Sequence, residues 1–204
     1  LADHFLIPRV PELRRRFPEI RLDVFADISH VNVLRREADI AIRQRPQDKS
    51  PAEASALVTK VGSFAFAAYA SAAYVERHGG PAYPAQDLEG HEMISTGKWS
   101  PGDPWNEQLA HPAKYVLSVY PFSAAIAAAA AGIGIAVLPC LGMDRDPRLV
   151  RLTDVIFAYD TWVVTSPGAQ NNPRVTKVKA ALIEMLRDAE RELSGALTLG
   201  RTEV

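Results

Sequence analysis

A run of residues without any charged side chain extends from 115 to 143, and nothing else in the sequence matches it. Its length alone would suit a membrane helix, which needs about 20 apolar residues. Pro121, Gly132 and Gly134 interrupt the run, however, and its many alanines contribute little to partitioning into lipid. The run therefore predicts several short buried elements of a globular fold and not a membrane span.

The pieces of this run have different patterns. Residues 115–119 alternate larger apolar side chains with smaller or polar ones, as a strand does. Residues 123–131 predict a short helix, with Ser123 as its N-cap and Gly132 as its C′ residue. Residues 133–138 predict a second, fully apolar strand. Strands this apolar are usually parallel and covered on both faces, so we expect a parallel strand–helix–strand unit.

The helix predicted over 123–131 has no polar face, because its sequence is almost entirely alanine. A helix that lies on a sheet normally carries one apolar and one polar side. We therefore expect either that something covers its outer side or that the helix lies deep in the core.

Length and composition are those of an ordinary globular protein. The 204 residues suffice for one large domain or two small ones. A formal net charge of −1 gives no electrostatic reason to expect nucleic-acid binding by this chain alone. Cys140 is the only cysteine and no secretion signal is visible, so we expect a cytoplasmic protein without disulfides.

The rest of the chain alternates helices with strands, which predicts an α/β fold. The helix at the start has no strand before it, so we expect a first strand N-terminal to Leu1 that this sequence lacks. Asn172 and Pro173 give the entry signal of the last helix. That helix is expected to bury Val175, Val178, Ala181, Leu182 and Met185. The predicted helices are 1–17, a short one within 27–36, 71–78 and one from 173; the further strands are 20–26, 38–43, 57–69, 91–96, 149–152 and 161–165.

No catalytic, cofactor or metal motif emerges from the sequence. The Gly132 and Gly134 pair fits only the front of a dinucleotide fingerprint, and it follows a helix instead of a strand. The five histidines are scattered without metal-ligand spacing, and Cys140 is best interpreted as a small apolar filler. The basic run 14–16 is best interpreted as a solvated helix end. We therefore do not expect an enzyme.

Residues at strand ends are the remaining candidates for function, because open α/β sheets bind ligands there. Phe122 and Ser123 stand at the start of the central helix, where free N–H groups suit carboxylates and phosphates. The alternative is simple capping for Ser29 and Ser123, and a surface ion pair for Arg43. The candidates are Ser29, Arg43, Thr96, Phe122 and Ser123.

Five motifs span nearly the whole chain: PELRRRFPEIRL, EADIAIR, YASAAYVERHG, DLEGHEMI and AAAAGIGIAVLP. In this order and spacing they resemble the C-terminal effector-binding domain of LysR-type transcriptional regulators. Pro104, Trp105 and Leu109, together with NPRV at 172–175, also fit one large subgroup of that family.

The resemblance implies a periplasmic-binding-protein-like type II fold, in which two Rossmann-like α/β subdomains are joined by two crossover segments. On this basis residues 1–68 with 166–193 form regulatory subdomain I, residues 69–165 form subdomain II, and residues 194–204 form a tail. The first strand and a DNA-reading winged helix-turn-helix would precede Leu1 and are absent from this sequence.

The resemblance also implies a function. A small-molecule effector, often an aromatic or other carboxylic acid, would bind in the cleft between the subdomains and change how the full-length tetramer acts on promoter DNA. One contact would lie just before Leu1, and Asp3 and His4 would border the cleft. The remaining contacts would fall on Ser29, Arg43, Thr96, Phe122 and Ser123, and no catalytic residue, cofactor or metal is implied.

In the resembled family the counterpart of the alanine-rich helix packs across a two-fold interface. We therefore expect an antiparallel dimer, with Ala127, Ala128 and Ala131 on one side and Ile7, Val10 and Arg14 on the other. The main alternative is an exported solute-binding protein of the same broad fold, and an enzyme of unknown chemistry is a second.

Overall fold

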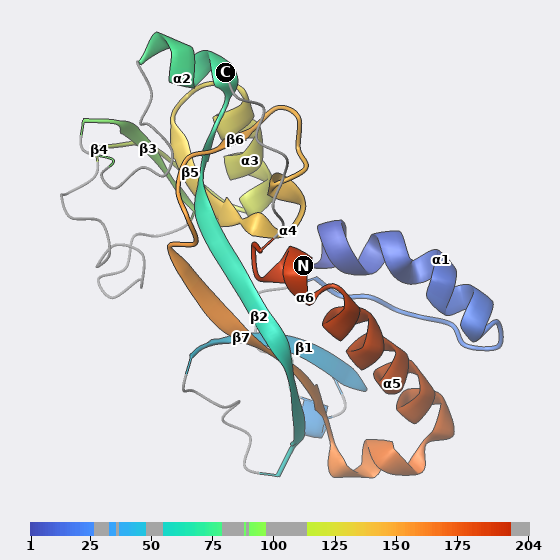
Figure 1. Cartoon of the computed structure of the whole chain (residues 1–204). Coiled ribbons are helices and arrows are strands. Elements are labelled where there is room, and N and C mark those ends of the chain that lie inside the picture. The colour runs from blue at the N-terminus through green and yellow to red at the C-terminus, as the bar shows by residue number, and fades with distance from the viewer. Residues whose placement is uncertain are drawn as a thin grey trace. The chain divides into compact units, whose positions relative to one another are not determined.

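The computed structural model divides into two compact units. Unit 1 contains residues 1–64 and 159–194, and unit 2 contains residues 65–158 and 195–204. Figure 1 shows the course of the chain and the element labels. The structure describes residues 1–26, 33–35, 37–47, 55–78, 88, 90–96 and 114–196.

Helices of unit 1 come from both ends of the chain. α1 (Ile7–Arg16) and α5 (Pro173–Asp188) lie side by side (Figure 1), and Arg16 Nη2 donates to Glu184 Oε2 between them at 2.8 Å. A second bond joins Arg9 to Glu192, with 3.3 Å between Nη2 and Oε2. The helices of this unit are η1 (Ala2–Leu6), α1 (Ile7–Arg16), η2 (Val33–Arg35), η3 (Pro167–Asn171), α5 (Pro173–Asp188) and α6 (Glu190–Leu193).

The start and the buried face of α5 follow its sequence. Asn172 is the N-cap, its side-chain oxygen accepts from the backbone N–H of Arg174 at 3.0 Å, and Pro173 occupies the first helical position. The five apolar residues predicted to be buried are all buried. The predicted entry signal and helical spacing are therefore confirmed.

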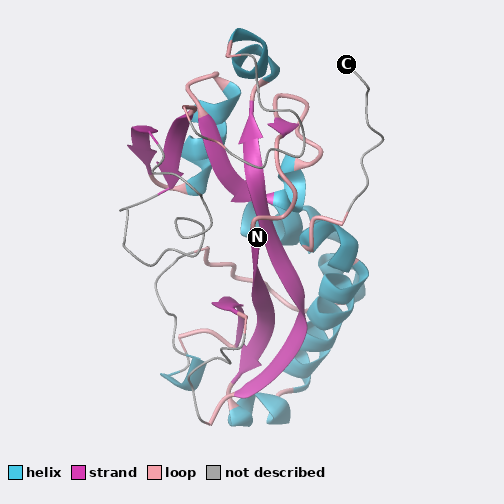
Figure 2. Cartoon of the chain, turned by 60° about the vertical axis from the view of Figure 1, so that its left-hand side comes forward, coloured by secondary structure: helices cyan, strands magenta, loops and turns pink. Residues whose placement is uncertain are grey.

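The strands of unit 1 include the antiparallel pair β1 (Ile40–Pro46) and β7 (Phe157–Thr165), shown in magenta in Figure 2. β7 is followed in the sheet by β2 (Leu57–Ala70), and both of these strands continue into unit 2. Among the strands that the structure describes, β1 is the terminal one of this sheet. Its polar residues therefore lie near one edge of the sheet.

The strand predicted over 20–26 is wrong, because these residues form no strand. Alternating apolar residues produce a strand only where a neighbouring backbone supplies ladder hydrogen bonds. Among the described residues, β1 pairs with β7 alone and no strand lies beyond it. The alternation of Ile20, Leu22, Val24 and Ala26 could not reveal that lack of a partner.

Unit 2 contains the parallel unit expected from the uncharged run. β3 (Glu92–Thr96) runs between β4 (Lys114–Val119) and β5 (Ile135–Pro139) and is parallel to both, so the connection through α3 (Phe122–Ala130) passes over β3. The predicted strand–helix–strand unit is thus confirmed, although β4 lies at the sheet edge with alternate residues exposed. The elements are α2 (Ala72–Arg77), β3 (Glu92–Thr96), β4 (Lys114–Val119), α3 (Phe122–Ala130), β5 (Ile135–Pro139), α4 (Cys140–Met143) and β6 (Val150–Arg151).

The alanine-rich helix α3 has one buried and one exposed side. Ala125, Ile126, Ala128 and Ala129 are buried, and all four belong to the apolar core of unit 2. Ala127 and Ala131 are exposed. The expectation that this helix lies deep in the core is therefore wrong. No element among the described residues covers the side that carries Ala127 and Ala131.

The ends of α3 confirm one predicted cap and correct the other. Gly132 follows the last turn with φ +77°, and its N–H donates to Ala129 O at 3.0 Å, as expected of a C′ glycine. Ser123 is not the N-cap, since Pro121 holds that position without a side-chain bond. Ser123 is the second residue of the helix, and it is exposed.

Candidate functional site

The five predicted ligand contacts fall on different parts of the structure. Arg43 belongs to unit 1, whereas Thr96, Phe122 and Ser123 belong to unit 2. Ser29 lies outside the described residues.

The unit 2 residues gather at the carboxyl ends of two parallel strands. Thr96 ends β3 and lies opposite Val119, which ends β4. α3 begins three residues later with Phe122 and Ser123. The strand-end rule therefore brings all three predicted residues of this unit to one edge of the sheet.

An aromatic cluster adjoins the start of α3. The ring of Phe122 lies 6.2 Å from that of buried Phe66, and Phe66 stacks on Phe157 at 4.6 Å. Phe122 is 37% exposed, so part of this apolar surface faces solvent. Phe66 and Phe157 were not predicted as site residues, because a strand pattern shows that a phenylalanine is buried but not which ring it meets. This edge combines the start of a helix, hydroxyls and aromatic surface, which suits an aromatic or apolar carboxylate.

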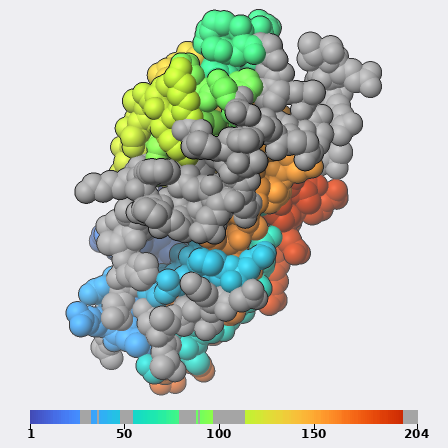
Figure 3. Space-filling view, turned by 90° about the vertical axis from the view of Figure 1, so that its left-hand side faces the viewer, coloured from blue at the N-terminus to red at the C-terminus, as the bar shows by residue number. Residues whose placement is uncertain are grey.

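Arg43 occupies a different position from the one predicted. The strand expected to end at Arg43 continues to Pro46, so Arg43 lies in the middle of β1, opposite Trp162. The reason is its pairing with β7, which extends the ladder through the polar residues 44–46. β1 is not fully buried, and part of it reaches the surface of the face shown in Figure 3.

Polar side chains cluster around this part of the β1–β7 pair. Lys60 Nζ lies 2.6 Å from Asp160 Oδ2 and 6.0 Å from the centre of the Trp162 ring. Asp160 lies opposite Arg45 in the register. Within the part of the chain that the structure describes, four buried side-chain atoms lack a hydrogen-bond partner, and all four belong to this pair of strands: Gln44 Nε2, Arg45 Nε, Thr161 Oγ1 and Trp162 Nε1.

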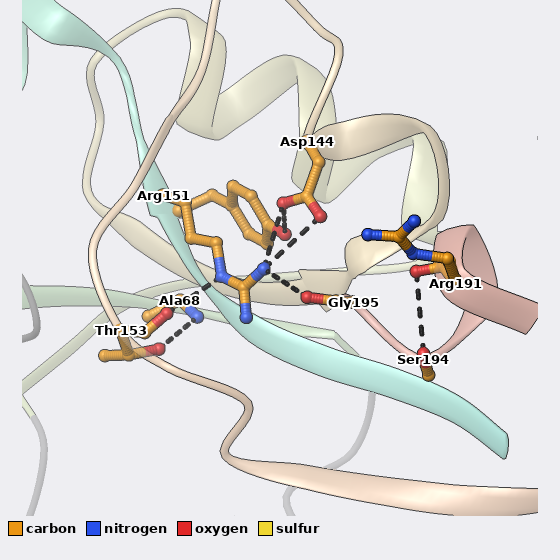
Figure 4. Close-up of polar contacts among 8 residues, drawn as sticks. Ala68, Asp144, Arg151, Thr153, Arg191, Ser194 and Gly195 are labelled. Carbon is orange, nitrogen blue, oxygen red and sulfur yellow. Dashed lines mark hydrogen bonds and ion pairs between the residues drawn. The ribbon is translucent and has the colours of Figure 1, made fainter. Parts of the chain in front are cut away.

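Unit 2 contains a second buried polar cluster, the Asp144 network, drawn in Figure 4. Asp144 Oδ1 accepts from the hydroxyl of Tyr69 at 2.6 Å, and Arg151 Nη1 lies 3.3 Å from Asp144 Oδ2. Arg151 also donates to the backbone oxygens of Thr153 at 2.9 Å and Gly195 at 3.1 Å. This network satisfies its members, so it has the character of a structural support.

Cys140 lies beside the Asp144 network and is buried. Burial raises the pKa of its thiol, which outweighs the opposing effects of the Tyr69 hydrogen bond and the Arg151 charge. Burial likewise is the main cause that raises the pKa of Tyr69. Gly195 packs so closely that an added Cβ would lie 2.8 Å from Cys140 Sγ, and its φ of +68° also favours glycine. The predicted filler role of Cys140 agrees with this tight packing.

Among the described residues, no group of three or more His, Cys, Asp or Glu side chains is placed to hold a metal ion. Every helix in the same part of the chain is too short or too polar to span a bilayer.

Comparison with known proteins identifies similar sequences. The family model described as LysR substrate binding domain matches residues 1–189. The HTH-type transcriptional regulator CrgA of Neisseria meningitidis (serogroup C, strain 8013) is 32% identical over 91 residues, which cover 45% of this chain and 29% of that protein. An HTH-type transcriptional regulator of Xanthomonas campestris pv. campestris is 29% identical over 94 residues, covering 46% of this chain and 26% of that protein. The matched segments thus span less than a third of these relatives.

Solved structures with a similar fold cover nearly the whole chain. The CrgA regulatory domain from Neisseria meningitidis has a TM-score of 0.75 at 21% identity, covering 91% of this chain and 93% of that one. The effector domain of AmpR of Pseudomonas aeruginosa has a TM-score of 0.72 at 17% identity, covering 93% and 92%. At these identities the likeness establishes the fold alone.

Proposed function

The chain belongs to the LysR substrate-binding domain family, and we propose that it binds a small carboxylate as the effector of a transcriptional regulator. It has the periplasmic-binding-protein-like type II fold of LysR regulatory domains, so the predicted fold class is confirmed. The family is a class of regulators and not of enzymes, which agrees with the sequence prediction. The curated relatives described above are also regulators, which favours a sensor over an exported solute-binding protein.

The arrangement at the start of α3 is the observation that carries the proposal of a carboxylate. Thr96 and Ser123 supply hydroxyls, and the N–H groups of Phe122 and Ser123 stand in the first turn of α3, while that of Ala124 donates to Pro121 O at 2.9 Å. Phe122 adds a partly exposed ring beside Phe66. An anionic group next to an apolar body fits this combination, because the positive end of the helix favours negative charge.

The proposal also includes the organisation expected for the full-length protein. Effector binding by two regulatory subdomains would alter how an oligomer acts on promoter DNA through a separate DNA-binding domain. Arg43 and Ser29 are proposed as the contributions of the first subdomain to the effector contacts.

A thermal-shift screen with acids and neutral compounds tests the effector proposal. A binding acid at about a hundredfold its Kd should stabilise the chain by roughly 2.7 kcal/mol and raise Tm by about 5 °C or more. Ser123→Ala should weaken the shift, whereas Ser118→Ala, at an exposed serine of β4, should leave it unchanged. If no compound in the panel raises the Tm of the native chain, effector binding is contradicted. If Ser123→Ala shows the same shift in Tm as the native chain, the start of α3 does not belong to the binding site.

We further propose that two copies associate through the exposed side of α3. Ala127 and Ala131 are exposed, as is Ile7 of α1, which would face them in the partner. Ala128 is removed from the expected interface, because it is 7% exposed and packs in the core of its own unit. Ala127→Glu should therefore give monomers by sedimentation velocity, with Ser118→Ala as the control. A dimer that persists in Ala127→Glu contradicts this interface.

A further inference from the structure

Tyr74 of α2 is joined to the start of β3 through its hydroxyl. The side chain is fully buried, and the backbone N–H of Glu92 donates to its oxygen at 3.0 Å. The same hydroxyl lies 3.4 Å from His91 Nδ1. Burial is the main cause that raises the pKa of Tyr74, so the hydroxyl keeps its proton at neutral pH. Because its oxygen already accepts from Glu92, the hydroxyl donates to His91, which requires a neutral imidazole.

Arg77, on the same helix, makes a link to α3. Its Nη2 donates at 2.7 Å to the carbonyl oxygen of Gly132, which follows the last turn of α3, where a cation suits the helix dipole. Its Nε donates to His78 Nε2 at 3.3 Å, and the His78 ring stacks on Tyr74 with 4.4 Å between ring centres. His78 accepts this bond only while its imidazole is neutral. Both links of α2 therefore use a neutral histidine as a hydrogen-bond acceptor.

The charged groups around these histidines do not favour a further positive charge. Arg77, Lys114 and Glu92 act electrostatically on Tyr74, and Glu92 is already paired with Lys114 at 3.2 Å. α3 contributes no charge, since residues 115–143 contain none. Glu76, also on α2, is exposed and forms no ion pair among the described residues. In that part of the chain an imidazolium here would meet two cations, a paired carboxylate and a solvated one.

We propose that these side chains form a pH-sensitive latch, which holds α2 against β3 and α3 at neutral pH and releases it in acid. The latch consists of Tyr74, Arg77, His78 and His91. Histidine is the side chain whose charge changes between about pH 5 and 8, and protonation turns its accepting nitrogen into a donor. The hydroxyl hydrogen of buried Tyr74 then has no acceptor among the described residues. Arg77 loses one bond and meets a second cation.

The latch fixes the sign of the pH effect on stability. The unfolded chain makes none of these bonds, so its histidines take up protons without losing them. In acid the folded chain therefore binds fewer protons than the unfolded chain, and its stability falls as the pH falls. The latch meets α3 at its C-terminal end, whereas the proposed effector contacts Phe122 and Ser123 lie at its start. The latch can therefore fail or hold independently of the effector proposal.

The experiment measures the Tm of the full chain at pH 7.5 and 5.5. The variant is His78→Gln with His91→Gln, because glutamine keeps an acceptor oxygen and does not titrate. We expect the Tm of the native chain to fall between the two pH values. The fall should be smaller in the variant, by about 2–4 °C for each histidine replaced. His4→Gln, at an exposed histidine of η1 in unit 1, is the matched control and should fall as much as the native chain.

Hydrogen exchange followed by mass spectrometry shows where acid acts, once the intrinsic effect of pH on exchange is corrected. At pH 5.5 the amides of α2 should lose protection in the native chain and keep it in the double variant. The latch is refuted if the Tm of the double variant falls as steeply as that of the native chain, or if His4→Gln removes as much of the fall. Unchanged protection of α2 in the native chain at pH 5.5 refutes it as well. If the double variant does not unfold cooperatively at pH 7.5, His78→Gln and His91→Gln are compared singly by the same criteria.

Discussion

Asp144 in unit 2 accepts from both Tyr69 and Arg151, whereas Arg45 in unit 1 has no acceptor among the described residues. Both places put charged side chains into partly or fully buried positions. The Asp144 network meets the hydrogen-bonding needs of its members with residues far apart in the sequence. The β1–β7 pair leaves its donors open, although Lys60 and Asp160 pair beside them.

The difference separates a satisfied buried network from an unsatisfied one. A satisfied buried network can hold a fold together, because each partner offsets the desolvation of the others. An unsatisfied cluster lowers stability and persists where something other than stability maintains it. Substitutions in the two clusters should therefore change the free energy of unfolding in opposite directions.

Asp144→Ala should produce the largest effect. It leaves the guanidinium of Arg151 buried without its carboxylate, and removal of one partner of a buried pair costs about 3–5 kcal/mol. Urea unfolding of the full chain measures the loss. The matched control is Asp23→Ala, which breaks the exposed pair with Arg21 and should cost at most about 1 kcal/mol. Similar losses in both variants would refute the structural role of the network.

Local signals explain which elements the sequence predicts well. α5 depends on a cap, a proline and helical spacing within its own residues, and its predicted face is buried as expected. The C′ glycine of α3 is equally local. Strand extent is not local, which is why the prediction ended β1 at Arg43 and placed a strand over 20–26. In both cases the answer depends on which backbone lies alongside.

The same distinction between local and non-local signals applies to the candidate site. The strand-end rule selected Thr96, Phe122 and Ser123, and the structure brings them to one edge of unit 2, while their contact with a ligand stays a prediction. The register of β1 against β7 could not be predicted from the sequence. The sequence interpretation placed Arg45 in a loop and Trp162 in a strand, and only the register between segments more than a hundred residues apart puts them on one side of the sheet.

Removal of one hydroxyl from each cluster gives the finest comparison. Tyr69→Phe deletes a bond to a carboxylate and should destabilise the chain by about 1.5–3 kcal/mol. Thr161 is fully buried with no partner for its hydroxyl, so Thr161→Val should stabilise the chain by about 1 kcal/mol, at nearly constant volume and with equal suitability for a strand.

Both variants should be unfolded in urea at pH 7. An unfolded tyrosine has a pKa near 10 and an unfolded cysteine near 8.5, and burial raises the pKa of both Tyr69 and Cys140 in the folded chain. Neither group therefore ionises in either state at pH 7, so the difference reports hydrogen bonding and packing alone. If Thr161→Val destabilises the chain as Tyr69→Phe does, the Thr161 hydroxyl has a partner in solution and the contrast between the clusters fails at that residue. If Thr161→Val stabilises the chain, the unsatisfied hydroxyl of Thr161 lowers the free energy of unfolding of the native protein.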